Sequence, residues 1–235
     1  MKSIFISALI GILIITGISS GYAQTPAQTD SISAWKIGVR SVGIGAGYYS
    51  PSLGYLNNES DIKNWDTKFK GAALFAVNLE LSLRKELSVR IEADYWKGTA
   101  KQTSVSDLLG GGSKLKEIKL VPVSAILLYN LTNSYIITPY VGLGAGAVFI
   151  NSKNEMNLKT LPSTLEKTSS VDMMFYGVGG VRYSIAKQLS VGGEVRYALG
   201  NYNEEMADTQ KIIDKRSISL NGIQLMVSLN YTFGK

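Results

Sequence analysis

The 235-residue sequence predicts an all-β fold, an eight-stranded antiparallel up-and-down transmembrane β-barrel. Three observations support this fold class. Apolar and polar residues alternate almost without exception from Phe69 to Tyr95, long and short connections alternate along the chain, and the face opposite the apolar one is rich in small residues. Because strand side chains point alternately to opposite sides, so long a period of two puts the two faces in different surroundings.

Alternation and turn residues place the individual strands. The eight expected strands span 35–49, 69–83, 87–96, 118–131, 139–150, 171–185, 189–197 and 218–233. In the first strand the apolar residues change from odd to even positions, which predicts a bulge near Arg40 or Ser41. In the fourth strand Pro122 cannot donate to a hydrogen-bond ladder, so we expect a bulge there or a strand that starts after it.

The connections between these strands alternate between long and short. Long polar connections are expected at 50–68, 97–117, 151–170 and 198–217, and short ones at 84–86, 132–138 and 186–188. All long connections thus fall at one end of the sheet, as in outer-membrane barrels with short periplasmic turns and longer extracellular loops. Segment 82–89 also resembles segment 184–191, which indicates one hairpin design used twice at the short-turn end.

The face opposite the apolar one carries many glycines, including Gly142, Gly144 and Gly146. Glycine weakens an exposed strand but suits a narrow interior where space is short. Aromatic residues gather near strand ends on the apolar face, as in the girdles that barrels place at membrane–water interfaces. We therefore expect the small, polar face inside and the apolar face in lipid, with a soluble periplasmic ligand-binding barrel as an alternative.

The N-terminal segment predicts export. Residues 1–23 have the charged start, short apolar core and small final residue of a signal peptide, with cleavage expected after Ala23. Residues 24–34 are then a short periplasmic segment and 35–235 the barrel. The chain has no cysteine, which excludes disulfides and a lipid-attachment site. A spread net charge of +6 predicts no nucleic-acid partner.

Four segments carry a family resemblance, namely 120–131, 139–146, 179–183 and 229–233. They resemble small outer-membrane β-barrel families, most closely the PorT-type outer membrane protein beta-barrel domain, and also the transmembrane domain of OmpA and OmpX. The resemblance implies an outer-membrane location. It also implies that the barrel-insertion machinery reads a C-terminal aromatic residue, which here is Phe233, followed by Gly234 and Lys235.

Charged residues on the small face are the only candidate functional constellation. An eight-stranded barrel is just wide enough for its side chains, so these charges must pair, because an isolated buried charge is costly. The predicted lumen ion-pair cluster consists of Glu80, Arg84, Arg90, Glu92, Asp94, Arg182, Glu194 and Arg196. A structural plug is the main interpretation, and a narrow channel for ions or small solutes is the alternative.

No enzymatic activity, cofactor or metal site is expected, because the chain has no histidine to act as a base and no cysteine nucleophile. One hypothesis gives connection 97–117 contacts to lipopolysaccharide phosphates through Lys97, Lys101, Lys114 and Lys116. A merely solvated loop is the alternative. The sequence thus predicts a monomeric outer-membrane protein in contact with lipid and lipopolysaccharide, with an envelope-structural or surface-interaction role.

Overall fold

The computed structural model describes residues 37–53, 70–102, 112–131, 136–158, 161–207 and 213–233. The signal peptide expected at 1–23, its cleavage after Ala23 and the segment 24–34 lie outside the described residues. These assignments therefore stay predictions. Within the described part of the chain, no helix is long and apolar enough to cross a membrane.

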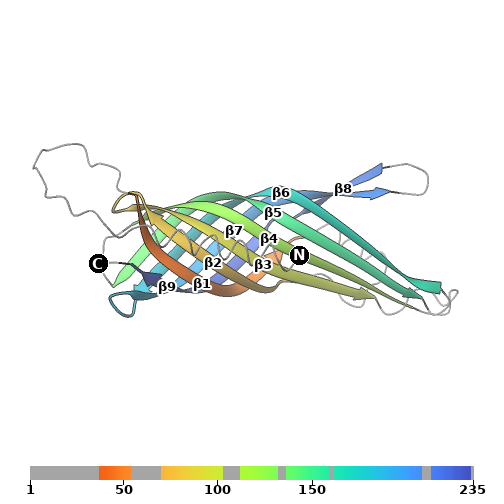
Figure 1. Cartoon of the computed structure of the whole chain (residues 1–235), viewed down its shortest axis with the longest axis horizontal. Coiled ribbons are helices and arrows are strands. Elements are labelled where there is room, and N and C mark those ends of the chain that lie inside the picture. Colours follow the sequence, from red (N-terminus) through yellow and green to blue (C-terminus); the bar gives the residue numbers. More distant parts are fainter. Residues whose placement is uncertain are drawn as a thin grey trace, which may run out of the picture.

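Nearly all described residues belong to antiparallel strands. The strands are β1 (Gly38–Pro51), β2 (Ala72–Ser82), β3 (Leu87–Gln102), β4 (Gly112–Asn130), β5 (Ile137–Leu158), β6 (Leu161–Ser184), β7 (Leu189–Ala207), β8 (Ile213–Ser219) and β9 (Gly222–Thr232). They pair in the order β6-β5-β4-β3-β2-β1-β9-β7, and β6 also pairs with β7. The sheet is therefore closed into an eight-stranded barrel, as predicted (Figure 1).

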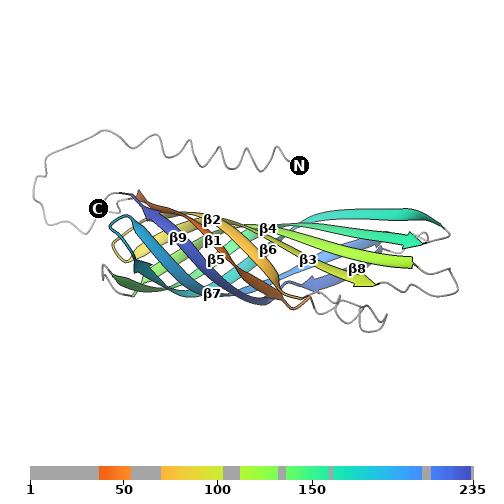
Figure 2. The ribbon, with the colours of Figure 1, turned by 90° about the horizontal axis from the view of Figure 1, so that it is seen from below.

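β7 pairs on one edge with two successive strands, β9 and β8. β9 pairs with β1 and with the first half of β7, whereas β8 pairs with the second half of β7. Only Leu220 and Asn221 separate β8 from β9. Figure 2 shows β9 beside β1 and β7. β7 and β8 continue outward as a separate hairpin (Figure 1).

Most strands are longer than predicted, because the expected connections 97–117, 151–170 and 198–217 consist largely of strand. The hairpins β3–β4, β5–β6 and β7–β8 all extend at the end opposite the short turns (Figure 1). Beyond Met174, β6 no longer pairs with β7, so the sheet β3–β6 and the hairpin β7–β8 project separately. The position of these three long connections was predicted correctly, but the expectation that they are loops was wrong. Most of the expected connections 50–68 and 132–138 lies outside the described residues.

The two expected irregularities have different outcomes. The register between β1 and β2 shifts between Val39 and Ser41, which confirms the predicted bulge. The expectation for Pro122 is wrong, because β4 runs through it and keeps its register with β5. The ladder from β4 to β3 lacks only the pairs between Ala93 and Trp96. A proline without an N–H group thus interrupts one ladder without inserting a residue.

The outward face of the barrel is apolar and the inward face holds the charges, as predicted. Outward Leu143 is 74 % exposed and Phe75 is 57 % exposed, whereas Glu80 and Glu92 are at most 2 % exposed. A soluble protein rarely exposes so large a continuous apolar surface, but a barrel in lipid requires one.

The apolar band ends at a definite residue on each long strand. Its last outward apolar residues at the long-hairpin end are Tyr48, Tyr95, Val121, Phe149, Val171 and Leu199. Two residues further out, the same strands carry Ser50, Lys97, Lys119, Asn151, Ser169 and Asn201. Near the short turns the band includes the exposed aromatic residues Tyr129, Tyr183, Tyr231 and Phe233. Its extent matches the ~9–11 residues that a tilted spanning strand needs.

Beyond this outer boundary the two faces exchange character. Outward positions become mostly polar, and inward positions form a cluster that we call the apolar layer, with members from seven strands, β1 to β7. Its largest fully buried members are Tyr49, Leu74, Trp96, Ile118, Leu120, Ile150, Met174 and Tyr202. The outer section of the barrel is therefore built like a water-soluble protein, apolar inside and polar outside, on top of a membrane section with the reverse pattern.

Candidate functional site

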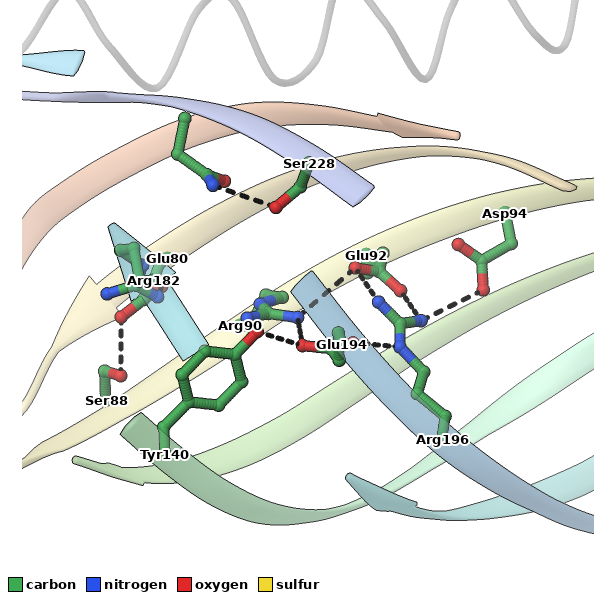
Figure 3. A network of polar contacts seen from close by, with 11 residues as sticks. Glu80, Ser88, Arg90, Glu92, Asp94, Tyr140, Arg182, Glu194, Arg196 and Ser228 are labelled. Atoms are coloured by element: carbon green, nitrogen blue, oxygen red, sulfur yellow. Dashed lines mark hydrogen bonds and ion pairs between the residues drawn. The ribbon is translucent and has the colours of Figure 1, made fainter. Parts of the chain in front are cut away.

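Charged side chains from five strands meet inside the barrel. Figure 3 shows those that come from β2, β3, β6 and β7. We call the whole set the lumen network. Its members are Arg40, Glu80, Arg90, Glu92, Asp94, Arg182, Glu194 and Arg196. Within the strands the members occupy every second position, so strand alternation aims their side chains into the lumen. Four guanidinium groups balance four carboxylates, so the network as a whole is neutral.

The central part of the network joins β3 to β7, which lie on opposite walls of the barrel. Arg90 Nη1 lies 2.7 Å from Glu194 Oε2, and Arg196 Nη2 donates to Glu92 Oε2 at 2.8 Å. Arg196 also contacts Glu194, and its Nη1 lies 3.5 Å from Asp94 Oδ2. The ion pairs therefore cross the lumen and tie its opposite walls together.

A second group lies nearer the short turns and is centred on Glu80 of β2. Arg182 Nη2, from the opposite strand β6, lies 2.6 Å from Glu80 Oε2. Arg40 Nη1 lies 3.4 Å from Glu80 Oε1, which also accepts a hydrogen bond of 2.8 Å from Ser88 Oγ. Arg40 and Arg182 are less buried than the central arginines, so this group faces the short-turn opening of the barrel.

Tyr140 of β5 links the two groups. Its hydroxyl donates to Glu194 Oε2 at 2.6 Å. Its ring centroid lies 5.5 Å from the guanidinium carbon of Arg90 and 5.4 Å from that of Arg182, within the range of cation–π attraction. The sequence analysis missed Tyr140 as a network residue, although alternation places it on the same face as Gly142 and Gly144.

The side chains around the lumen network are closely packed. A cavity of about 10 Å³ lies beside the network, lined by Gly45, Asn78, Arg90, Glu92, Glu194, Arg196, Met226 and Ser228. That volume accommodates about one water molecule. The glycines that were predicted to face the interior make this packing possible, since a Cβ atom on Gly144 would lie 2.7 Å from Ile126 Cγ1.

Seven of the eight predicted cluster residues meet in the network, and Arg84 does not. β2 ends at Ser82, so Arg84 is an exposed residue of the short turn before β3. The assignment of Arg84 to the lumen is therefore wrong, because the alternation was extended past the strand end. Arg40, the residue at the bulge in β1, belongs to the network and was not predicted.

The four lysines predicted to share a flexible loop lie instead on strands. Lys97 and Lys101 are exposed on the outward face of β3, whereas Lys116 of β4 is buried inside. Lys114 also belongs to β4, and its side chain lies outside the described residues. In the described ranges, no group of three or more histidine, cysteine, aspartate or glutamate residues could hold a metal ion.

Comparisons with known proteins agree with this architecture. Outer membrane protein OprG from Pseudomonas aeruginosa is 15 % identical, with a match covering 83 % of this chain and 97 % of that chain at a TM-score of 0.55. A major outer membrane protein from Thermus thermophilus is also 15 % identical, with coverages of 84 % and 100 % and a TM-score of 0.51. At such identities the likeness shows the fold alone.

A sequence comparison with curated proteins finds no match. Residues 14–233, however, match the family described as "Outer membrane protein beta-barrel domain". This match spans nearly the whole chain and agrees with the closed barrel and its apolar outward band. The chain therefore belongs to the outer membrane protein beta-barrel domain family and lies in the outer membrane.

Proposed function

We propose that this protein is a closed, non-conducting barrel that anchors its long hairpins at the cell surface, in an envelope-structural or surface-interaction role. The observation that carries the proposal is the filling of the interior by two successive layers, the lumen network and the apolar layer. The soluble periplasmic carrier considered from the sequence does not fit a protein of the outer membrane.

The apolar layer supports a lumen that excludes ions. Trp96 is its largest fully buried side chain. The Trp96 Nε1 group donates to the backbone oxygen of Tyr49 at 3.2 Å, and the two rings meet edge to face at 5.7 Å between centroids. Gly98 leaves room for the indole, since a Cβ atom there would clash with it. An ion crossing this layer would lose most of its hydration among apolar side chains, which is costly.

The lumen network supports the same role. Its charges are fixed by pairs that span the barrel, and separating a buried pair is costly. A permeating ion would have to replace an arginine or a carboxylate in a set that is already neutral. The network therefore acts as a brace between opposite walls, and not as a conduction path.

The same geometry argues against catalysis. Glu80, Glu92 and Glu194 are each paired with at least one arginine, and all three side chains are buried in the packed lumen. The chain contains neither histidine nor cysteine, the commonest base and the most reactive nucleophile. We therefore propose a non-enzymatic role.

Single-channel recording of the refolded protein in planar bilayers tests this proposal. We expect no conductance steps from the wild-type protein under conditions in which a general porin, recorded in the same membrane, gives clear steps. The channel alternative predicts reproducible steps that disappear in Arg90→Gln or Glu92→Gln. Observing such steps would overturn the closed lumen.

A further inference from the structure

Two lysines mark the outer boundary of the apolar band on one side of the barrel. Lys97 of β3 and Lys119 of β4 are direct partners in the register between these strands. Each lies two residues beyond the last outward apolar residue of its strand, Tyr95 and Val121. Their side chains are 42 % and 43 % exposed. Both amines therefore reach the level at which lipid head groups begin.

Charge at this level is confined to one wall. The corresponding first polar residues on β1, β5, β6 and β7 are Ser50, Asn151, Ser169 and Asn201, all uncharged. Like charges directly opposite each other destabilise a pair of strands. The Lys97–Lys119 pair thus destabilises the sheet locally, whereas the other four strands carry uncharged residues at the same level.

Glu117 offsets only part of this repulsion. Its Oε2 lies 2.7 Å from Lys97 Nζ, and its Oε1 lies 3.1 Å from Lys119 Nζ. The trio therefore keeps one net positive charge, and exposed Lys101 lies further out on the same face of β3. The hydrogen bond and charge of Glu117 raise the pKa of Lys97, so its ammonium group persists at all physiological pH values.

We propose that Lys97 and Lys119, with Lys101 beyond them, bind a phosphate group of lipopolysaccharide on the β3–β4 wall. Long hairpins face outward in barrels of this type, so the boundary lies in the outer leaflet, where lipopolysaccharide carries its phosphates. Two adjacent amines suit a phosphate, which offers several strong acceptor oxygens and more than one negative charge. The inference rests on the surface orientation in the proposed function, but not on a closed lumen.

Native mass spectrometry of the refolded protein in detergent, titrated with lipid A, tests the site. A lysine near an anionic lipid surface contributes about 1 kcal/mol, or about fivefold in affinity. We expect Lys97→Gln with Lys119→Gln to weaken binding of bisphosphorylated lipid A by about 25-fold. Glu117→Gln should strengthen it, because that change removes the neutralising carboxylate.

The matched control is Lys85→Gln with Lys187→Gln, which removes two exposed lysines from the short turns at the opposite end. It should leave binding unchanged, and a heat-shift gel establishes that every variant is folded. Equal loss in the control and the test variant would overturn the site. Equal affinity of the wild type for dephosphorylated lipid A, or for phosphatidylglycerol, would overturn the assignment to lipopolysaccharide phosphate. Absence of conductance in all variants would leave the closed lumen intact, so the two proposals fail separately.

Discussion

Removal of Arg196 is the most severe single perturbation of the lumen network. Its side chain is 2 % exposed and touches three carboxylates, those of Glu92, Asp94 and Glu194. Arg196→Met keeps most of the volume and removes the charge. Glu92 and Glu194 would then keep their pairs with Arg90, and Asp94 would lose its pair with Arg196. Removing one partner of a buried ion pair costs about 3–5 kcal/mol, and we expect the free energy of unfolding to fall by that amount.

Two further variants separate charge from packing. Arg84→Met makes the same chemical change at an exposed turn and should alter the free energy of unfolding by no more than about 0.5 kcal/mol. Adding Glu92→Gln to Arg196→Met removes one of the carboxylates that contacted Arg196, so the double variant should regain stability. We expect a coupling of about 1–3 kcal/mol between the two sites.

Reversible urea unfolding in lipid vesicles, followed by circular dichroism and by heat-shift gels, measures these differences. If Arg196→Met cannot fold, the double variant should still fold, so the comparison remains decisive. A loss below about 1 kcal/mol for Arg196→Met would refute the reasoning. A second full loss on adding Glu92→Gln would refute it as well, because the two residues would then act independently.

Three smaller predictions concern packing, hydrogen bonding and pH. Gly144→Ala should destabilise the barrel by about 1–3 kcal/mol through overpacking, whereas Gly179→Ala, with nothing within 4 Å of its added Cβ atom, should not; urea unfolding compares them, and equal losses would contradict the assigned faces. Tyr140→Phe removes the hydrogen bond to Glu194 and should cost about 1.5–3 kcal/mol in the same assay, so an unchanged midpoint would argue against that bond. Lipid A affinity should not fall from about pH 7 to 9, because Lys97 loses its charge only as the pH rises through a raised pKa; an affinity that falls across this range in native mass spectrometry would speak against the lysine site.

The membrane section could be predicted from the sequence because lipid and lumen impose opposite demands on alternate residues. The residue type alone therefore predicts that Phe75 faces outward and that Glu80 faces the lumen. The bulge in β1 was also visible, since one extra residue moves the apolar positions from odd to even. The glycine-rich face of β5 likewise pointed inward, because neighbouring Ile126 needs its space.

The outer section could not be predicted in the same way. Alternation reflects a difference between the surroundings of the two faces of a strand, and it does not report backbone pairing. At Val121 the apolar positions of β4 change from the inward to the outward face. The expected strand therefore began at Ile118, where the apolar positions change face. The actual strand β4 begins at Gly112. The same limit misplaced Lys116, which lies inside the barrel rather than on a loop.

The central claim is a barrel that is apolar toward lipid and closed within. Photolabelling of the refolded protein in vesicles with a lipid-soluble carbene precursor, followed by peptide sequencing in a mass spectrometer, tests it without any mutation. Three consecutive residues of β4 are decisive, because Leu127 is 47 % exposed while Ile126 and Leu128 are fully buried. Adducts on Leu127 and none on its two neighbours are predicted. Equal or heavier labelling of Ile126 and Leu128 would contradict the account.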